Sequence, residues 1–334
     1  QSAQFWTQLW QFAGVIGERG ERTLINPEQM PGAQWFPDAQ INFAENLLRH
    51  NSSAEALVFW GEDQVRRRVS YAELQAQVSR LQQAFKALGV QAGDRVAGYL
   101  PNLPETLIAM LAASSLGAIW SSCSPDFGVQ GVLDRFGQIQ PKVLLCADGY
   151  HYNGKQHDCL AKLAQISAQL PSVQQVIVIP YVQHAPSVEH LPNTALLEAL
   201  LAPYAPAPLE FVRLPFNHPL YIMYSSGTTG APKCIVHGAG GTLLQHLKEH
   251  LLHTDLHPHD RLFYFTTCGW MMWNWLVSGL AAGATLLLFD GSPFYPSGNI
   301  LFDYAEQERC TVFGTSAKFI DACHKQHLQP IHSH

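Results

Sequence analysis

The sequence predicts an α/β fold in which two lobes of mainly parallel sheet are flanked by helices, in layers of the order αβαβα. Short segments that are almost wholly apolar alternate with segments of helical periodicity over most of the chain. Such apolar strands are typical of a parallel sheet that helices cover on both faces. The chain has 334 residues, which is more than one hydrophobic core usually spans, so we expect two lobes.

Residues 1–55 carry many aromatic residues and prolines without a clear period, and we expect them to form a leader that packs on the body. The first lobe is predicted to cover residues 56–205. Its first helix begins with a capping box, Ser70 with Glu73, and is expected to end at Gly89. The alternation then predicts strands at 95–100, 118–122, 142–147 and 176–179, and helices at 105–116, 129–138 and 159–170.

Residues 180–219 hold several prolines and little periodicity, which is typical of a linker or a surface excursion. The second lobe is predicted to cover residues 206–334 and to begin with a strand–loop–strand hairpin. After this hairpin we expect helices at 242–253 and 273–282, and strands at 261–266, 285–289 and 311–314.

The composition is that of a globular enzyme, with 47% hydrophobic and 14% charged residues. The formal net charge of −6 argues against a nucleic-acid partner, because no basic face would offset repulsion by phosphate. The seven cysteines include no C-x-x-C pair, which favours reduced thiols over a disulfide framework. No segment has the roughly eighteen apolar residues of a membrane span and no signal peptide is visible, so we expect a cytoplasmic protein without a membrane partner.

The segment SSGTTGAPK, residues 225–233, has the chemistry of a phosphate-binding loop. Its glycines let backbone amides turn toward an anion, its hydroxyls add donors, and its lysine adds a positive charge. It differs from the Walker loop because Pro232 precedes the lysine and β-forming residues follow it. The alternative is an ordinary polar hairpin loop. The candidate phosphate ligands are Ser225, Ser226, Gly227, Thr228, Thr229, Gly230 and Lys233.

Residues 225–233 match at every position the pattern S/T-S-G-S/T-T-G-x-P-K of the adenylate-forming superfamily of acyl-CoA synthetases, which the chain resembles. The segments FPDAQINFAENLLR, CSPDFGVQ and GWMMWNW resemble the acetoacetate-activating members of that superfamily. The resemblance implies an AMP-forming acid–thiol ligase whose partners are small molecules: ATP with Mg²⁺, acetoacetate and CoA. It also implies that Thr228 and Lys233 are catalytic. The oligomeric state is left open.

The resemblance further implies an acyl pocket lined by Gly269, Trp270 and Met271. The alternative is that this cluster belongs to the core, as aromatic and methionine clusters usually do. A metal site is also conceivable at His246 and His250, which are four residues apart on a predicted helix. No third ligand is indicated, so we expect a solvated helix face and assign no metal ligands to the protein.

Gly314, Thr315 and Ser316 end a predicted strand, and the resemblance places them at the border of the acyl site. The alternative is a simple strand-to-helix turn with Ser316 as the N-cap. Lys155, in the loop Tyr-Asn-Gly-Lys, could meet a phosphate of CoA, although a lone loop lysine is usually solvated surface.

The resemblance stops before the adenine and ribose motifs, the hinge and the C-terminal lysine of full members of the superfamily. We therefore expect a truncated large domain of the adenylate-forming fold, without the small C-terminal domain and inactive by itself. Two alternatives stay open. The acid could be acetate, propionate or a medium-chain acid, or the chain could be a non-catalytic module that binds polyphosphate or a partner.

Overall fold

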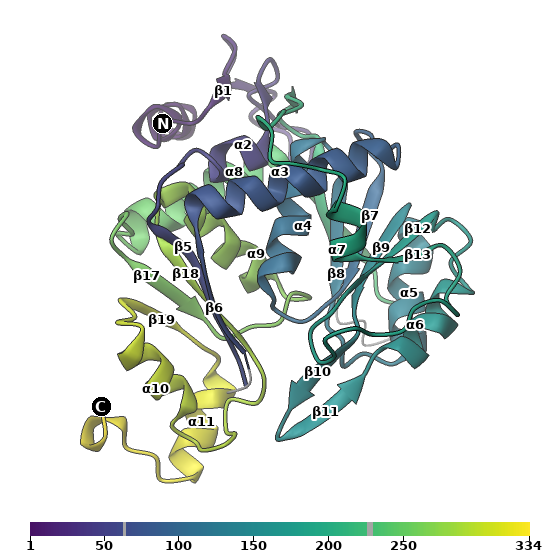
Figure 1. The fold of residues 1–334 in the computed structure, drawn as a ribbon. Coiled ribbons are helices and arrows are strands. Elements are labelled where there is room, and N and C mark those ends of the chain that lie inside the picture. Colours follow the sequence, from purple (N-terminus) through teal and green to yellow (C-terminus); the bar gives the residue numbers. More distant parts are fainter. Residues whose placement is uncertain (63–64, 226–229) are drawn as a thin grey trace.

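A computed structural model describes residues 1–62, 65–225 and 230–334. Two large sheets lie side by side, with α4 (Pro104–Ser115) and α9 (Met271–Ser278) between them (Figure 1). The two ends of the chain lie at opposite ends of the molecule. One sheet has seven strands and the other has five.

The seven-stranded sheet has the order β13-β12-β9-β7-β8-β15-β16. Its pairings are parallel except for the last, where β15 and β16 form an antiparallel hairpin. The strands are β7 (Arg95–Tyr99), β8 (Ile119–Cys123), β9 (Val143–Ala147), β12 (Gln175–Ile179), β13 (Thr194–Leu196), β15 (Pro219–Tyr224) and β16 (Cys234–Gly238).

The five-stranded sheet has the order β19-β17-β18-β5-β6. Its strands are β5 (Glu55–Gly61), β6 (Val65–Ser70), β17 (Arg261–Tyr264), β18 (Thr285–Asp290) and β19 (Val312–Gly314). The two sheets interleave along the chain, because β5 pairs with β18 whereas β15 pairs with β8. Each large sheet therefore contains strands from before and after residue 205. The division into lobes of 56–205 and 206–334 stays a prediction.

Alternate residues of the central strands enter different cores, which explains why these strands are apolar throughout. In β5, Leu57 and Phe59 belong to the core between the sheets, whereas Val58 and Trp60 belong to an outer core. The inner core contains α4 and α9 together with α3 (Tyr71–Ala87) and α8 (Ala239–Lys248). The predicted order of layers, αβαβα, is confirmed.

Helices also cover the outer face of each sheet. The seven-stranded sheet is covered by α5 (Val129–Ile139) and α6 (Leu160–Ser167), whose apolar residues share a core with β7, β9 and β12. The five-stranded sheet is covered by α10 (Ile300–Gln307) and α11 (Ala317–Lys325). The smaller elements are β10 (Gly149–Tyr152), β11 (Lys155–Asp158), α7 (Leu197–Leu201), β14 (Leu214–Pro215), η1 (Glu249–His253), η2 (Gly279–Ala282) and η3 (Pro330–His332).

Local signals predicted several element ends well. Ser70 and Glu73 form the predicted capping box at the start of α3, with the Glu73 amide donating to the Ser70 hydroxyl at 3.2 Å. The predicted linker 180–219 was wrong in part, because it contains β13, α7 and β14. These elements are too short for a period to show in the sequence.

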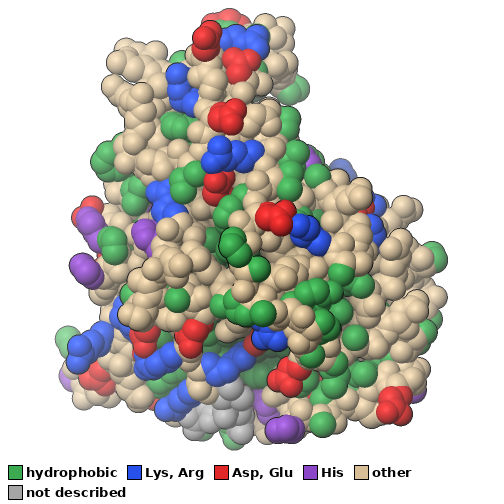
Figure 2. Space-filling view, turned by 45° about the horizontal axis from the view of Figure 1, so that its top comes forward, with side chains coloured by type: hydrophobic (Ala, Val, Ile, Leu, Met, Phe, Trp, Pro, Cys, Tyr) green, Lys and Arg blue, Asp and Glu red, His purple; other side chains and the backbone are tan. Residues whose placement is uncertain are grey.

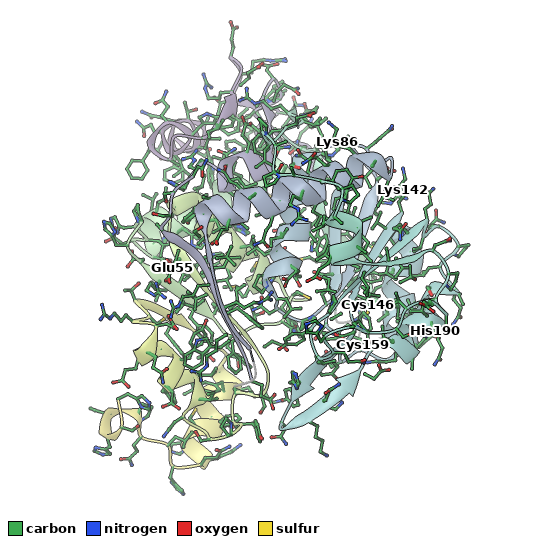
Figure 3. The ribbon with its side chains drawn as sticks, in the orientation of Figure 1. Glu55, Lys86, Lys142, Cys146, Cys159 and His190 are labelled. Carbon is green, nitrogen blue, oxygen red and sulfur yellow. The ribbon has the colours of Figure 1, made fainter. Side chains whose placement is uncertain are left out.

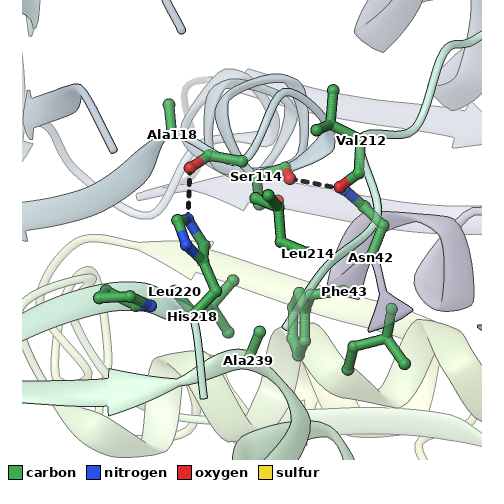
Figure 4. Close-up of a pocket in the computed structure, with 12 residues that line it drawn as sticks. Asn42, Phe43, Ser114, Ala118, Val212, Leu214, His218, Leu220 and Ala239 are labelled. Atoms are coloured by element: carbon green, nitrogen blue, oxygen red, sulfur yellow. Dashed lines mark hydrogen bonds between the residues drawn. The ribbon is translucent and has the colours of Figure 1, made fainter. Parts of the chain in front are cut away.

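The N-terminal segment forms a set of short elements that contact the body: α1 (Ser2–Phe12), β1 (Gly17–Glu18), β2 (Leu24–Ile25), β3 (Gln34–Trp35), β4 (Gln40–Ile41) and α2 (Phe43–Leu47). Asn42 caps α2, and its side-chain amide donates to the carbonyls of Ser114 and Val212 at 3.0 and 2.8 Å. Figure 4 shows this junction and the small pocket beside it, where the His218 ring contacts the Gly117 carbonyl at 2.8 Å. The exact end of the leader at residue 55 stays a prediction.

Candidate functional site

The candidate phosphate loop joins β15 to β16, as a strand–loop–strand arrangement requires. The Ser225 amide donates to the Lys233 carbonyl at 3.0 Å, and the Lys233 amide donates to the Ser225 hydroxyl at 3.0 Å. These two bonds close the hairpin directly beyond the last strand pair, Tyr224 with Cys234. Four of the candidate phosphate ligands, Ser226, Gly227, Thr228 and Thr229, lie outside the residues that the structure describes.

The described part of the loop, residues 230–233, is mostly exposed and is supported at its base. Gly230 has a φ of +114°, a backbone conformation that side-chain-bearing residues rarely adopt. The Gln138 side-chain amide donates to the Pro232 carbonyl at 2.7 Å, so α5 supports the base of the loop. Lys233 is exposed and makes no ion pair within residues 1–62, 65–225 and 230–334. Its ammonium is thus available to an anion from solvent.

Strand β8 makes side-chain hydrogen bonds to the strand that leads into this hairpin. The Ser121 hydroxyl donates to the Ile222 carbonyl at 2.8 Å and lies 2.9 Å from the Tyr224 hydroxyl. Burial raises the pKa of Tyr224 well above its usual range, so this phenol stays protonated at neutral pH. These contacts connect β8, β15 and the hairpin, and the sequence contained no signal for them.

The segment from Cys268 to Ser278 divides into a buried part and an exposed part. Trp270 and Met271 have 66% and 43% of their surface exposed, so they are not core residues. Trp273 is fully buried, and its indole N–H donates to Asn102 at 2.8 Å. A Cβ added at Gly269 would have no neighbour closer than 3.6 Å, so the space around this residue does not require a glycine. The role of these residues in an acyl pocket stays a proposal.

Gly314, Thr315 and Ser316 connect β19 to α11. A Cβ added at Gly314 would lie 2.1 Å from the Tyr264 ring, so only glycine fits here. The Ser316 hydroxyl accepts a hydrogen bond from the Phe319 amide at 3.2 Å, which confirms its predicted alternative as the N-cap of α11. The Thr315 hydroxyl is buried without a hydrogen-bond partner in the described part of the chain. A binding role for the three residues stays a proposal.

Lys155 begins β11, in a hairpin with β10 that projects from the end of the seven-stranded sheet (Figure 1). Its side chain is exposed and has no ion pair in the described ranges. The turn before it is held by Glu62, whose carboxylate accepts from the amides of Asn153, Gly154 and Ser292. Glu62 is 1% exposed, and it joins this hairpin to the ends of β5 and β18.

A second carboxylate, partly buried, connects the two sheets. Asp290, at the end of β18, accepts a hydrogen bond from the Tyr181 hydroxyl at 3.1 Å. Burial raises the pKa of Asp290 to about 7, and the negative charge of Glu62 adds to the effect. Sequence reasoning missed Glu62 and Asp290, because their partners are far away in the chain.

The prediction of a solvated face for His246 and His250 was wrong. Both rings are buried: His246 lies 2.7 Å from the Ser278 hydroxyl, and His250 lies 2.8 Å from the Trp275 carbonyl. Burial lowers the pKa of His246 to about 3 and that of His250 to about 4, so both are neutral. His246 thus connects α8 to α9, and His250 connects η1 to α9. Among the described residues no group of three or more His, Cys, Asp or Glu side chains is arranged to hold a metal ion.

The surface shows where charge gathers. Acidic and basic side chains are interspersed on the face in Figure 2, apart from a group of basic side chains at its lower left. Much of the basic charge in β6 is paired: Arg67 binds Glu105, and Arg68 binds Glu55 and Glu308. In the described part of the chain no helix is both long and apolar enough to cross a membrane.

The cysteines are free, and most are buried. Figure 3 shows Cys146 and Cys159 within the seven-stranded sheet and its outer helices. Burial raises the pKa of the Cys146 thiol well above its ordinary value, so this thiol is unreactive.

The chain is similar in sequence to curated proteins over most of its length. It is 58% identical over 334 residues to an acetoacetyl-coenzyme A synthetase of Rhizobium meliloti, covering 99% of this chain and 51% of that protein. It is 46% identical over 340 residues to the acetoacetyl-CoA synthetase of Mus musculus (99% and 50%). A malonamoyl-CoA synthetase, vrtB of Penicillium aethiopicum, is 46% identical over 308 residues, with 87% of this chain and 42% of that protein covered.

A solved structure has the same fold. The acetoacetyl-CoA synthetase from Streptomyces lividans superposes with a TM-score of 0.92 at 44% identity, over 98% of this chain and 50% of that one. The chain thus spans about half the length of the curated relatives that it matches. The pattern of the family described as "AMP-binding enzyme" matches residues 43–333. The chain belongs to this family of AMP-binding enzymes.

Proposed function

We propose that this chain supplies the phosphate-binding and acyl-binding part of an acid–thiol ligase. The ligase activates acetoacetate as acetoacetyl-AMP and transfers the acyl group to CoA. The hairpin closed by Ser225 and Lys233 carries the proposal, because it presents an exposed ammonium beside glycines and hydroxyls. The names of the relatives support acetoacetate as the acid, and acetate, propionate and medium-chain acids are the alternatives.

ATP fits the hairpin by its chemistry. Lys233 offers one positive charge, and Gly230 has a positive φ, which favours glycine at this position. In the proposed reaction the carboxylate oxygen of the acid would attack the α-phosphorus of ATP, the bond from that phosphorus to the bridging oxygen would break, and pyrophosphate would leave. In this proposal Lys233 neutralises the negative charge that spreads over the phosphates, and Thr228 contributes its hydroxyl. Mg²⁺ accompanies the nucleotide, and no protein ligand is assigned to it.

CoA and the acyl group have weaker candidates. Lys155 is the proposed contact of a CoA phosphate, because its ammonium is exposed at the edge of a rigidly held hairpin. Gly269, Trp270 and Met271 are proposed to line the acyl pocket from the start of α9, and residues 314–316 to border it. We also infer a cytoplasmic location, since scattered free thiols are typical of a reducing compartment.

The test is ATP–pyrophosphate exchange by the full-length gene product with acetoacetate. Replacing Lys233→Ala removes the positive charge and should lower kcat/KM for exchange about 100-fold or more. Lys325→Ala is a matched control, since Lys325 is exposed and forms an ion pair with Asp321 on its own helix. Equal activity of both variants and the wild type would contradict the proposal.

The alternative of a non-catalytic binding module is separated by titration calorimetry of the same protein with ATP and with pyrophosphate. Binding of ATP without exchange in the presence of any of the acids would favour the module. Exchange that depends on acetoacetate would exclude it. Running acetate, propionate and octanoate in parallel identifies the preferred acid.

A further inference from the structure

A small cavity lies where the ends of β8 and β15 meet the start of α9. Its volume is about 10 Å³, which is the space of about one water molecule. It lies beside the candidate acyl site, because Gly269 lines it and precedes the exposed Trp270. It also lies beside the phosphate hairpin, since Met223 lines it two residues before Ser225. The polar residues that line it are Ser122, Tyr221 and Asn274.

Asn274 has hydrogen-bonding capacity left over in this cavity. The residue is 4% exposed, and its side-chain carbonyl has no partner among the described residues. Within the described residues, the hydrogen-bond acceptor of its amide nitrogen is the Met223 sulfur, at 3.6 Å, and a thioether is a weak acceptor. Leaving such a group unpaired costs about 1–3 kcal/mol of folding free energy. The unpaired oxygen could bond only to a donor, whereas the NH₂, whose contact with Met223 is weak, can still donate to a ligand acceptor beside the candidate site.

The Ser122 hydroxyl is already satisfied. It accepts from the Trp120 indole N–H at 3.2 Å and donates to the Cys268 carbonyl at 2.7 Å. The Tyr221 hydroxyl, like the Asn274 oxygen, has no hydrogen-bond partner among the described residues, and the rest of the lining is mostly apolar. A ligand group that accepts from the Asn274 NH₂ here must be about the size of one water molecule. A carbonyl oxygen meets both requirements.

The acyl groups named among the relatives carry such an oxygen. Acetoacetyl and malonamoyl groups both have a carbonyl on their third carbon, followed by a methyl or an amino group of similar size. We propose that the side-chain NH₂ of Asn274 binds the C3 carbonyl oxygen of the acid. Asn274 thereby selects 3-oxo acids over short acids without that oxygen. This inference rests on the proposed function of the chain.

Butyrate provides the matched substrate, since it has the chain length of acetoacetate and lacks only the C3 oxygen. Asn274→Leu keeps the side-chain volume and removes the amide. In ATP–pyrophosphate exchange by the full-length gene product, we expect its kcat/KM for acetoacetate to fall 10- to 100-fold, on the order of one lost buried hydrogen bond. Its kcat/KM for butyrate should stay the same or rise. The midpoint temperature of unfolding of the variant should be at least as high as that of the wild type, because the variant lacks the unpaired polar group.

Asn102→Leu is the control variant. Asn102 is also buried and also contacts α9, through the Trp273 indole, but it does not line the cavity. It should lower the activity with both acids by the same factor. If the leucine variant folds poorly, Asn274→Ala provides a second measurement of the ratio of kcat/KM for acetoacetate to kcat/KM for butyrate.

The outcomes separate the two proposals. A wild type that is active with acetoacetate, combined with an unchanged ratio of the two acids in Asn274→Leu and Asn274→Ala, overturns the role of Asn274 alone. A wild type that activates none of the acids overturns the proposed function and this role with it. A fall of the ratio in both variants, with the ratio kept in Asn102→Leu, supports the role.

Discussion

Ser225 and Lys233 bond to each other twice through their backbones and the Ser225 hydroxyl, at 3.0 Å in each case. The two residues stand at opposite ends of the candidate phosphate loop. Their pairing sets where the loop leaves the sheet and keeps the Lys233 backbone in place while its side chain remains exposed. The loop is thus anchored at its base by contacts that leave the Lys233 ammonium unused, although one of them uses the hydroxyl of Ser225, itself a candidate phosphate ligand.

The Ser225 hydroxyl is predicted to contribute to this anchoring. Ser225→Ala removes the acceptor of the Lys233 amide, which is worth about 1 kcal/mol. We expect a several-fold rise of the KM for ATP in the exchange assay. Ser333→Ala, in the exposed C-terminal turn, should leave the KM unchanged. Equal KM values in both variants would show that the hydroxyl is dispensable.

Two glycines near the candidate acyl site are predicted to respond differently to a methyl group. Gly314→Ala places a Cβ 2.1 Å from the Tyr264 ring, so it should lower the free energy of unfolding by about 1–3 kcal/mol. At Gly269 the nearest atom would be 3.6 Å away, so Gly269→Ala should change the stability by less than about 1 kcal/mol. Urea unfolding of both variants measures the difference. A larger loss at Gly269 than at Gly314 would contradict the packing described here.

Asp290 is predicted to make stability depend on pH. Its pKa is raised from 3.8 to about 7 in the folded state, so the unfolded state loses this proton first as the pH rises. The free energy of unfolding should therefore fall between about pH 4 and pH 7, at up to about 1.4 kcal/mol per pH unit from this group. Asp290→Asn should remove this slope. Parallel stability profiles of the variant and the wild type would show that the carboxylate ionises normally.

His250 is predicted to have the opposite effect. Its pKa is lowered from 6.5 to about 4, so its contribution to stability is complete above pH 6.5 and is lost as the pH falls toward 4. His250→Gln removes the titration and keeps a donor for the Trp275 carbonyl. The variant should lose less stability than the wild type between pH 7 and pH 5, as measured by urea unfolding. The same loss in both proteins would indicate that the ring is protonated in the folded state.

The sequence by itself was sufficient for the layered architecture. A strand buried on both faces must be apolar at every position, and β5 shows why: Leu57 and Val58 are neighbours in the chain but enter two different cores. The capping box at Ser70 and the hairpin at residues 225–233 were also predicted, because capping and turn formation depend on residues only a few positions apart.

The tertiary structure alone decided which strands pair and which polar groups are buried. Nothing local to β5 specifies that its partner is β18, more than two hundred residues later. The four-residue spacing of His246 and His250 is the same on an exposed helix face as on a buried one, and only the packing of α8 and η1 against α9 made those rings neutral. Asn274 is likewise an ordinary helical residue in the sequence, and its unpaired amide exists only because β8, β15 and α9 meet around it. Contacts between distant segments set burial, and burial sets the charge and hydrogen-bonding capacity of each group.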